Sequence, residues 1–516
     1  MEAFIGWPAF GMAFLPIAVL IALLLVFKVR ASVASLCGLG TAILVGVLYF
    51  GAPASGLPLQ AVKGAWNALS IFIVICPAML IYQVLSEADM FTHIKAKVSG
   101  MLRDDLLQVL FIGWAFAGFL QSVTGFGVPV AVCAPILVGF GFSPVTAVII
   151  SILGHAWGGT FGTLAIAWDS MLMQAGITDG ALIARTALNT GLMLWLETAI
   201  CGFVIYALYK KKQGEKKIVV REIIYVIVIS AVQGGGQLLT AYFNPSVACF
   251  IASTLAIITI FLLDRLSPKR KAPQAAETGA GAVSTFDVIM PYLVLVVLVV
   301  VVLLVGPVNR LLGQFQVGLT LPDGTGGASV YSPLSIFTHS GTVLLVTAVL
   351  LYAWYLKKGH VQRQNMGVVV SNALKKAGQS ILPVLCLIIM SKVMDGTGQI
   401  TVLAGGVAGL MQGAYPFAAP FIGILGSFIC SSNMSSNILF TGFQNSIAAS
   451  LEMDPAVILA AQTAGGSIGN LLATSNIVLG LITTKAAGQE NRVLKFLFPI
   501  ALGIGLLCGI LTFNLL

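Results

Sequence analysis

Two short polar strings interrupt long apolar runs of the sequence, and their residue types are suited to binding a carboxylate and a small cation. The first string covers residues 121–129 (QSVTGFGVP) and the second covers residues 431–437 (SSNMSSN). A helix that begins inside such a string offers free N–H groups and a partial positive charge to a carboxylate. Ser, Thr and Asn oxygens, with unpaired backbone carbonyls, suit a hard cation. We interpret both strings as polar tips of re-entrant hairpins.

Two glycine strings, GGTFG at 158–162 and GGSIG at 465–469, interrupt later apolar runs and predict two broken helices. Each follows a polar residue and a proline that favour a helix start, at 143–144 and 454–455. In a bilayer, non-helical backbone persists only where it lines a cavity or is buried in protein, so matching breaks indicate a binding site. The opposing interpretation is that Gly and Ser merely allow close helix packing. The predicted substrate-binding residues are Gln121, Ser122, Thr124, Gly125, Gly127, Gly158, Gly159, Thr160, Asn433, Ser435, Ser436, Asn437, Gly465, Gly466, Ser467 and Arg185.

Ionisable side chains inside apolar runs are a second functional signal, because burying them is costly. His155 could relay a proton, or it could be held by a backbone carbonyl. Glu197 lies deep in its run and either carries a proton or pairs with a cation of another helix. Arg185, near a helix end, either snorkels to the interface or holds a carboxylate. The predicted coupling-ion residues are His155, Glu197, Asn470, Thr474, Ser475 and Asn476.

The composition identifies the class of protein that presents these residues. Of 516 residues, 58% are hydrophobic and only 9% are charged, whereas soluble domains contain about 25% charged residues. The mean hydropathy is +1.01. Soluble enzymes, nucleic-acid binders and disordered chains are therefore disfavoured, and we expect an all-α polytopic membrane protein with roughly 12–14 membrane segments. The net charge of +9 comes from basic clusters between apolar runs, which indicates topology rather than a nucleic-acid partner.

The order of these features is repeated along the chain. Basic residues place both termini outside and make the two halves inverted repeats, an architecture of many secondary transporters. We expect five regions. They are 1–104, scaffold spans and cytoplasmic arm of the first repeat; 105–212, its hairpin and broken-helix transport region; 213–285, an extra helix pair and cytoplasmic linker; 286–412, scaffold spans and outer arm of the second repeat; and 413–516, its hairpin, broken helix and last span. The eight cysteines lack metal-site spacing and predict no metal or other cofactor.

Several ordered strings resemble the L-lactate permease family of secondary transporters. They are GFL at 118–120, TGFGVPVA at 124–131, LVGFGF at 137–142, SNMSSNILF at 432–440, the AAQ to GGxxG stretch at 460–469 and GQE at 488–490; Arg185 matches an arginine expected there. The resemblance implies H⁺-coupled uptake of L-lactate and related 2-hydroxymonocarboxylates such as glycolate. It also implies a place in the bacterial inner (plasma) membrane, paired hairpins and an elevator-type movement. A homodimer built on the plain spans fits the wider superfamily.

The sequence departs from the family pattern at three positions. Family members typically carry Glu at the place of Gln121, often Asp at the place of Asn433, and a basic residue near Asn470. Either His155 or Glu197 then carries the proton, or coupling uses Na⁺ held by Ser, Thr and Asn oxygens. The alternative function is therefore a Na⁺-coupled transporter of another organic anion, a dicarboxylate or sulfonate. A passive channel and a membrane-embedded enzyme are weaker alternatives, and the sequence contains neither G-x-S-x-G nor H-E-x-x-H.

Overall fold

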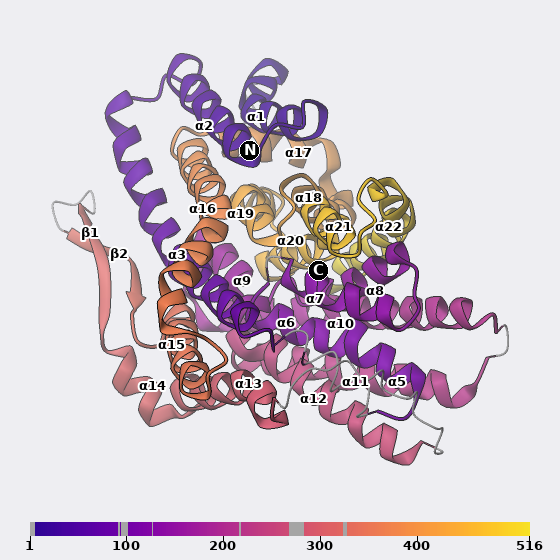
Figure 1. Cartoon of the computed structure of the whole chain (residues 1–516). Helices are drawn as coiled ribbons and strands as arrows, with labels where there is room; N and C mark the ends of the chain where they lie inside the picture. The colour runs from indigo at the N-terminus through magenta and orange to yellow at the C-terminus, as the bar shows by residue number, and fades with distance from the viewer. Residues whose placement is uncertain are drawn as a thin grey trace. The chain divides into compact units, whose positions relative to one another are not determined.

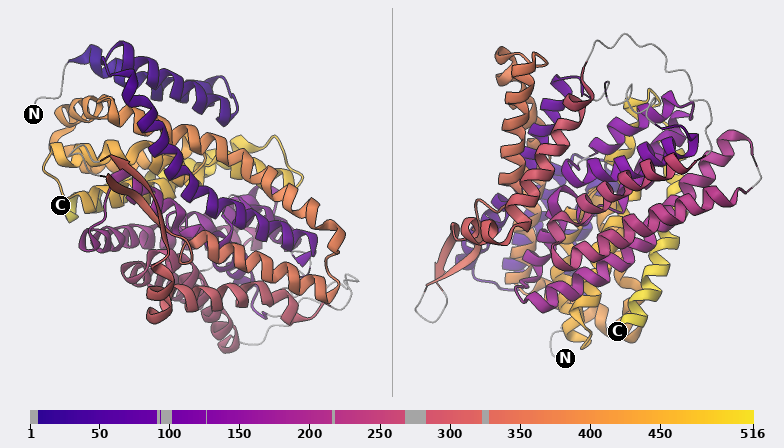
Figure 2. Two further views of the ribbon diagram at one scale, coloured as in Figure 1. Left: turned by 90° about the vertical axis from the view of Figure 1, so that its left-hand side faces the viewer. Right: turned by 90° about the horizontal axis from the view of Figure 1, so that it is seen from below.

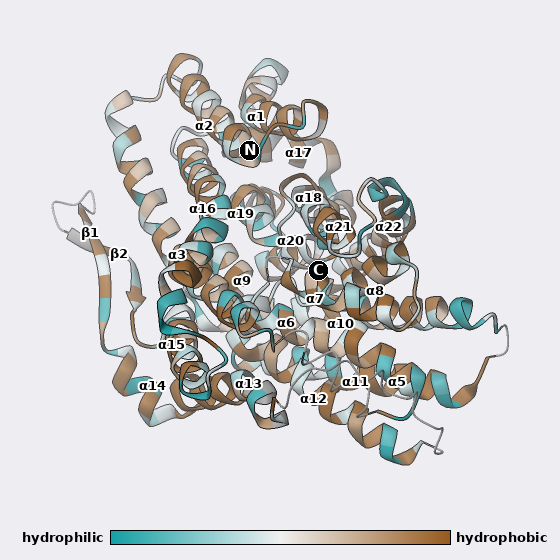
Figure 3. Cartoon of the chain, viewed as in Figure 1, coloured by the Kyte–Doolittle hydropathy of each residue, from teal (hydrophilic) through white to brown (hydrophobic). Residues whose placement is uncertain are grey.

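The computed structural model describes residues 6–90, 93, 102–125, 127–215, 218–267, 283–322 and 328–516. Much of the predicted cytoplasmic arm, nearly all of the predicted linker, and Phe126 of the first polar string lie outside these residues. Within them, 12 helices are long and apolar enough to cross a membrane. Figure 3 shows hydrophobic residues along most helices and hydrophilic ones mainly near helix ends and connections. The prediction of an all-helical, multi-pass membrane protein is confirmed.

One β-hairpin is the exception to the helical fold. Strands β1 (Gln316–Pro322) and β2 (Ala328–Ser335) pair antiparallel, with a register irregularity between Val317 and Leu319. The helix that follows this hairpin begins at Ser340. Alternating Val, Leu, Thr and Tyr give this segment a strand period that its turn residues obscure in the sequence.

The described chain divides into two compact units. The first unit comprises residues 1–64, 105–267 and 382–516, and the second comprises residues 65–104 and 268–381. The first unit therefore brings together the two predicted hairpins and the two predicted broken helices. The five regions expected from the sequence remain a prediction.

The first unit contains two series of helices in the same order (Figure 1). The first series is α5 (Asp105–Leu110), η3 (Phe111–Phe116), α6 (Ala117–Val123), α7 (Val128–Gly139), α8 (Pro144–Ala156), α9 (Gly162–Ala175) and α10 (Gly180–Gln213). The second is α18 (Tyr415–Cys430), α19 (Asn433–Ser450), α20 (Pro455–Gly469), η7 (Asn470–Leu472), α21 (Thr474–Thr483) and α22 (Glu490–Leu515).

The remaining elements of this unit are α1 (Trp7–Ile21), η1 (Ala22–Val26), α2 (Ala31–Leu48), η2 (Ala54–Gly56), α11 (Val220–Phe243), α12 (Pro245–Leu266), α17 (Gln399–Met411) and η6 (Gln412–Ala414). Helices α11 and α12 lie side by side, and α11 also lies along α10 (Figure 2). This pair follows the first series in the sequence, and α12 packs against α6 and α9. The predicted extra pair thus supports the first hairpin and broken helix directly.

Helix starts in both series follow the predicted polar-proline signal. Ser143 accepts a hydrogen bond from the backbone N–H of Thr146 at 3.3 Å, and Asp454 accepts one from Ala456 at 2.9 Å. Pro144 and Pro455 then occupy first-turn positions, where their missing N–H costs nothing. The long helix α10 is capped by Asp179 and ends at Gly214, which adopts the left-handed conformation that favours glycine.

The second unit contains most of α3 (Leu57–Glu87) and of α16 (Met366–Gly396), with α13 (Thr285–Val299), η4 (Val300–Leu304), α14 (Gly306–Gly313), the β-hairpin, α15 (Ser340–Lys358) and η5 (Arg363–Asn365). The helical segment 293–304 bends by 75° into α14. Asp287 ties the unit together, because it accepts a hydrogen bond from Nε1 of Trp354 at 3.0 Å while its backbone carbonyl accepts one from Tyr355 at 3.1 Å.

Candidate functional site

The first polar string is a sharp break between α6 and α7. Gly125 and Gly127 have φ values of +56° and +81°, and Gly127 is the N-cap of α7. A methyl group on Gly125 would collide with Oγ1 of Thr163, so this position requires glycine for both its backbone and its space. Ser122 and Thr124 donate their hydroxyl hydrogen bonds to carbonyls of their own helix, at Phe119 and Leu120.

The second polar string is a break between α18 and α19, which pack against each other. Ser431 adopts a left-handed conformation with φ +54°, and Ser432 is the N-cap of α19, accepting a hydrogen bond from the backbone N–H of Ser435. Asn433 is the first residue of α19 and is buried. The N-terminal ends of α7 and α19 therefore both begin at the predicted tips.

The first glycine string interrupts its helix as predicted. Helix α8 ends at Ala156, the chain turns through residues 157–161, and Thr163, Leu164 and Ala165 then have φ values of +48°, +51° and +67°. Three consecutive non-glycine residues in the left-handed region cost about 1–2 kcal/mol each. All three are buried, with exposures of 0–3%. Such strain persists only where the surroundings hold it, and it gathers at functional sites.

The second glycine string does not interrupt its helix, which corrects the position predicted for that break. Residues 465–469 lie inside α20, and the break follows at η7 and Ala473, whose ψ is 105°. The string remains helical because its glycines admit close neighbours: methyl groups on Gly465 and Gly469 would collide with Pro420 and Ile424 of α18. For these glycines, the packing interpretation explains the spacing.

A buried hydrogen-bond network joins the second tip to the first broken helix. It is formed by four side chains that are each at most 2% exposed, those of Thr160, Asn433, Asn437 and Thr463. Nδ2 of Asn433 donates to Oγ1 of Thr160 at 3.0 Å and to the carbonyl of Thr463 at 3.1 Å. Thr160 in turn donates to the same carbonyl at 2.9 Å. Nδ2 of Asn437 donates to the carbonyl of Ala167 and to Oγ1 of Thr463, both at 2.9 Å.

The second helix break and the first tip are connected to the second tip as well. Ser431 lies 3.0 Å from Thr474, hydroxyl to hydroxyl, and accepts a hydrogen bond from the backbone N–H of Ser475. A methyl group on Gly127 would lie 3.1 Å from Oδ1 of Asn476. Thus the second tip contacts the start of α21, and the first tip contacts it as well. Both tips and both breaks meet in one region, which is exposed at Thr474 and Ser475.

Comparison with known proteins decides the family. The sequence model of the L-lactate permease family matches residues 9–516. The chain belongs to the L-lactate permease family. It is 26% identical to the L-lactate permease of Streptococcus iniae, over 86% of this chain and 92% of that protein. It is 25% identical to the L-lactate permease of Bacillus subtilis (97% and 94% coverage) and 24% identical to the glycolate permease GlcA of Escherichia coli (97% and 94%).

Among solved structures, this L-lactate permease family member is similar to the YdaH transporter of Alcanivorax borkumensis. The sequence identity is 16%, the TM-score is 0.46, and the alignment covers 90% of this chain and 89% of that chain.

The ionisable residues of this L-lactate permease family member lie in two different surroundings. Nδ1 of His155 donates to the carbonyl of Ser151 at 2.6 Å, the bond that the carbonyl-held interpretation expects, and its role as a proton relay stays a prediction. Glu197 is fully buried on α10, and neither carboxylate oxygen has a hydrogen-bond partner within the described part of the chain. The hydroxyl of Ser467 donates a hydrogen bond to the carbonyl of Ala156 at 2.6 Å.

Arg185 lies apart from the residues that join the tips. Its guanidinium binds the carboxylate of Asp454 at 3.0 and 3.4 Å, and its side chain is 59% exposed. Asp454 is the N-cap of α20, so the ion pair links the second turn of α10 to the start of the second broken helix. Other predicted residues lie near the joined tips and breaks. Gln121 packs on Gly158 and Gly162, and a methyl group on Gly159 would approach Asn470 and Ser467.

Sequence reasoning missed several uncharged polar residues that this family member buries around the site. Gln462 reaches Ser436 and Asn437, at 3.2 Å to the hydroxyl of Ser436, and Gln444 donates to Gln462 at 2.9 Å. Tyr415 donates to Gln444. On α11 and α12, Gln233 and Ser253 lie against Gly118 of the first hairpin. The available signal was an amide or hydroxyl inside an apolar run, which we sought only for ionisable residues.

Proposed function

We propose that the protein imports L-lactate or a related small 2-hydroxymonocarboxylate, such as glycolate, in symport with H⁺ across the bacterial inner membrane. Family membership supports a carrier of small carboxylates, and the relatives named above are permeases for lactate and glycolate. The observation that carries the proposal is the meeting of two hairpin tips and two helix breaks, linked by Asn433, Thr160 and Ser431.

The carboxylate would be bound by the N-terminal ends of α7, α19 and α21. These ends offer backbone N–H groups without helical partners, and the helix dipoles favour an anion there. Thr474, Ser475 and Ser431 supply hydroxyls at the exposed side of the group, where a substrate hydroxyl could be bound. The predicted tip and break residues are thus the proposed substrate site, and their role in binding is part of this proposal.

The two helical series would be inverted repeats that move as an elevator, with both termini outside. Their equal order supports this: hairpin, broken helix, then one long helix, α10 in the first series and α22 in the second. Helix packing is consistent with one moving body, because α10 packs on α20 and α22 packs on α18. Alternating access of a site at the repeat interface is the general mode of such carriers.

Glu197 is the proton carrier in this proposal. It is fully buried on α10, and α10 packs against α20, the helix that contains the GGSIG string. An ionisable side chain buried inside a membrane-spanning helix is a functional candidate by default, and we assign to Glu197 the loading and release of the proton that accompanies the substrate.

Na⁺-coupled transport of another organic anion, a dicarboxylate or sulfonate, is the second candidate. A specific observation favours it: Oδ1 of Asn433 and Oγ of Ser427 are both buried without hydrogen-bond partners among the described residues. Both atoms lie next to Gly466. Two unpaired oxygens beside Gly466 would serve as two ligands of a cation, since Na⁺ prefers oxygen ligands.

Uptake of labelled L-lactate into proteoliposomes separates these candidates from one another. We expect accumulation above the outside concentration when the outside is acidic and Na⁺ is absent. Accumulation driven only by a Na⁺ gradient at equal pH would show that Na⁺, and not H⁺, is the coupling ion. Competition with glycolate, dicarboxylates and sulfonates would identify the transported anion. Equilibration without accumulation would indicate a channel, and conversion of the substrate in detergent would indicate an enzyme.

A further inference from the structure

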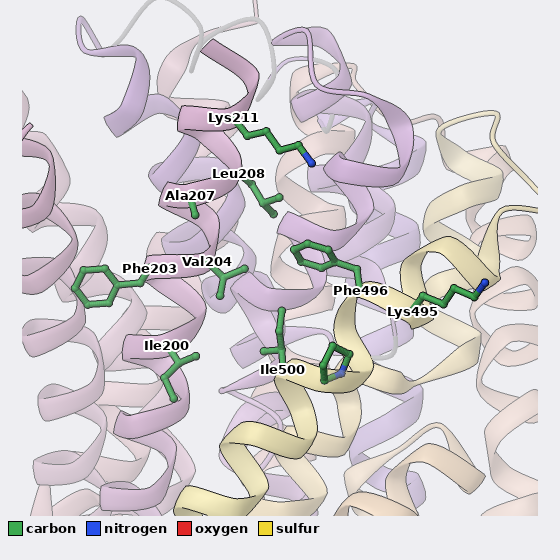
Figure 4. Close-up of a pocket in the computed structure, with 10 residues that line it drawn as sticks. Ile200, Phe203, Val204, Ala207, Leu208, Lys211, Lys495, Phe496 and Ile500 are labelled. Carbon is green, nitrogen blue, oxygen red and sulfur yellow. The ribbon is translucent and has the colours of Figure 1, made fainter. Parts of the chain in front are cut away.

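A groove between α10 and α22 lies outside the proposed substrate site. It has a volume of about 680 Å³ and is lined mainly by apolar side chains, which include Ile200, Val204, Phe496 and Ile500. Figure 4 shows Val204, Phe496 and Ile500 facing the space between the two helices. On α10 the lining positions are 200, 203, 204, 207 and 208, one continuous stripe of a helix.

Two lysines form the polar end of this groove. They are Lys211 on α10 and Lys495 on α22, and both are exposed. Lys211 extends over Phe496 toward α22, whereas Lys495 extends from α22 away from the groove (Figure 4). Among the described residues that line the groove, none is acidic. The groove is therefore apolar along most of its length and positively charged at one end.

Neighbouring lysines have partners, which distinguishes the two lysines of the groove. Lys210 binds Glu215 at 2.6 Å and Glu222 at 3.2 Å, and Lys212 donates to the carbonyl of Phe140. No ion pair of Lys211 or Lys495 is formed with the described part of the chain. Their charge is available to a ligand from outside the protein.

We propose that this groove binds an anionic phospholipid, with an acyl chain against the apolar stripe and the phosphate at Lys211. Lys495 adds positive charge at the rim. The groove lies between membrane-spanning helices, so lipid is the apolar molecule that surrounds it. Basic clusters at this end would face the cytoplasm, where the inner leaflet carries anionic lipids. The inference depends on this membrane setting and not on the proposed substrate.

The bound lipid would lie one turn from the proposed proton carrier. Ile200 follows Glu197 by three residues on α10, and α10 packs against α22. Helices α10 and α22 thus flank both Glu197 and the groove. A lipid between them would help to set their spacing.

Native mass spectrometry of the purified full-length chain tests the binding. The probes are dioleoylphosphatidylglycerol and dioleoylphosphatidylcholine at equal concentration. We expect wild type to retain the anionic lipid with about fivefold preference. Lys211→Ala should abolish that preference and Lys495→Ala should weaken it. Lys357→Ala, which removes an exposed lysine at the end of α15, should leave it unchanged.

A second pair of variants tests the apolar part of the groove. Ala207→Trp fills the groove and keeps both lysines, so we expect it to reduce retention of both lipids. Ala231→Trp changes an exposed alanine on α11 in the same way and should retain them. Wild type without a preference for the anionic lipid would overturn the proposal. So would Lys211→Ala with the wild-type preference, or equal retention by the two tryptophan variants.

Discussion

Nδ2 of Asn433 lies 3.0 Å from Oγ1 of Thr160, although the two residues are 273 positions apart in the sequence. Asn433 begins the helix after the second hairpin tip, and Thr160 lies in the break of the first broken helix. One hydrogen bond therefore joins two interruptions that belong to different halves of the chain.

The bond between Asn433 and Thr160 should be visible as energetic coupling. Asn433→Ala and Thr160→Val should each lower kcat/KM for L-lactate uptake about tenfold or more, since about 1.4 kcal/mol is typical for one buried hydrogen bond. Each change removes the shared bond and also a bond to the carbonyl of Thr463, so the double variant should lose clearly less than the sum of the two single losses. Initial uptake rates in proteoliposomes with equal protein content measure this. Fully additive losses would show that the two side chains act independently.

Gly466 should tolerate no side chain. Its Cβ position is occupied by Oδ1 of Asn433, so Gly466→Leu would displace Asn433 from Thr160 and abolish uptake while the protein still inserts. Gly503→Leu is the matched control, since Gly503 on α22 has open space around it. Membrane fractions quantify insertion, and labelled L-lactate measures uptake. Normal uptake by Gly466→Leu would remove this segment from the proposed site.

The left-handed segment 163–165 should be a source of strain that glycine relieves. Ala165→Gly removes the Cβ that disfavours φ +67°, so we expect a gain of about 1 kcal/mol in the free energy of unfolding. Ala147→Gly, inside the regular helix α8, should cost about 1 kcal/mol. Apparent melting temperatures in one detergent compare the two variants. A lower melting temperature for Ala165→Gly would show that its methyl packing outweighs the strain.

Glu197→Gln should separate substrate movement from proton coupling. Gln imitates the neutral carboxyl but cannot release a proton, so accumulation driven by an acidic outside should be lost. Exchange of labelled for unlabelled L-lactate at equal pH should persist, because exchange needs no net proton movement. Glu452→Gln, at an exposed residue between α19 and α20, is the control for carboxylate removal. Full pH-driven accumulation by Glu197→Gln would assign the proton to another group.

The sequence predicted the parts of the site that depend on local signals. The tip at 121–129 and the break at 158–162 could be located because Gly125 and Gly127 stand beside polar residues and a proline inside an apolar run, and because Gly158 and Gly159 follow a helix that starts at 143–144. The second break was predicted a few residues too early, because Gly465, Gly466 and Gly469 remain helical for packing against α18 and α19. Local sequence cannot distinguish a glycine needed for φ from one needed for space.

The amide network was beyond sequence reasoning for a different reason. Gln444 and Gln462 are uncharged, and what makes them important is that they meet each other and Asn437 across separate helices. Likewise, the sequence did not identify the partners that these ionisable residues have, Ser151 for His155 and Asp454 for Arg185. Partners more than a few residues apart are set by tertiary packing, which one sequence does not specify.

Equilibrium binding of labelled L-lactate to the purified full-length protein tests whether the joined tips and breaks are the substrate site. Asn437→Ala removes the side chain that bridges Ala167 and Thr463, and Asn514→Ala removes an exposed amide of α22 as the control. We expect wild type and Asn514→Ala to bind L-lactate saturably and glycolate to compete with it. Folded Asn437→Ala should show no measurable binding of L-lactate. Binding of L-lactate to Asn437→Ala with the wild-type Kd would contradict it.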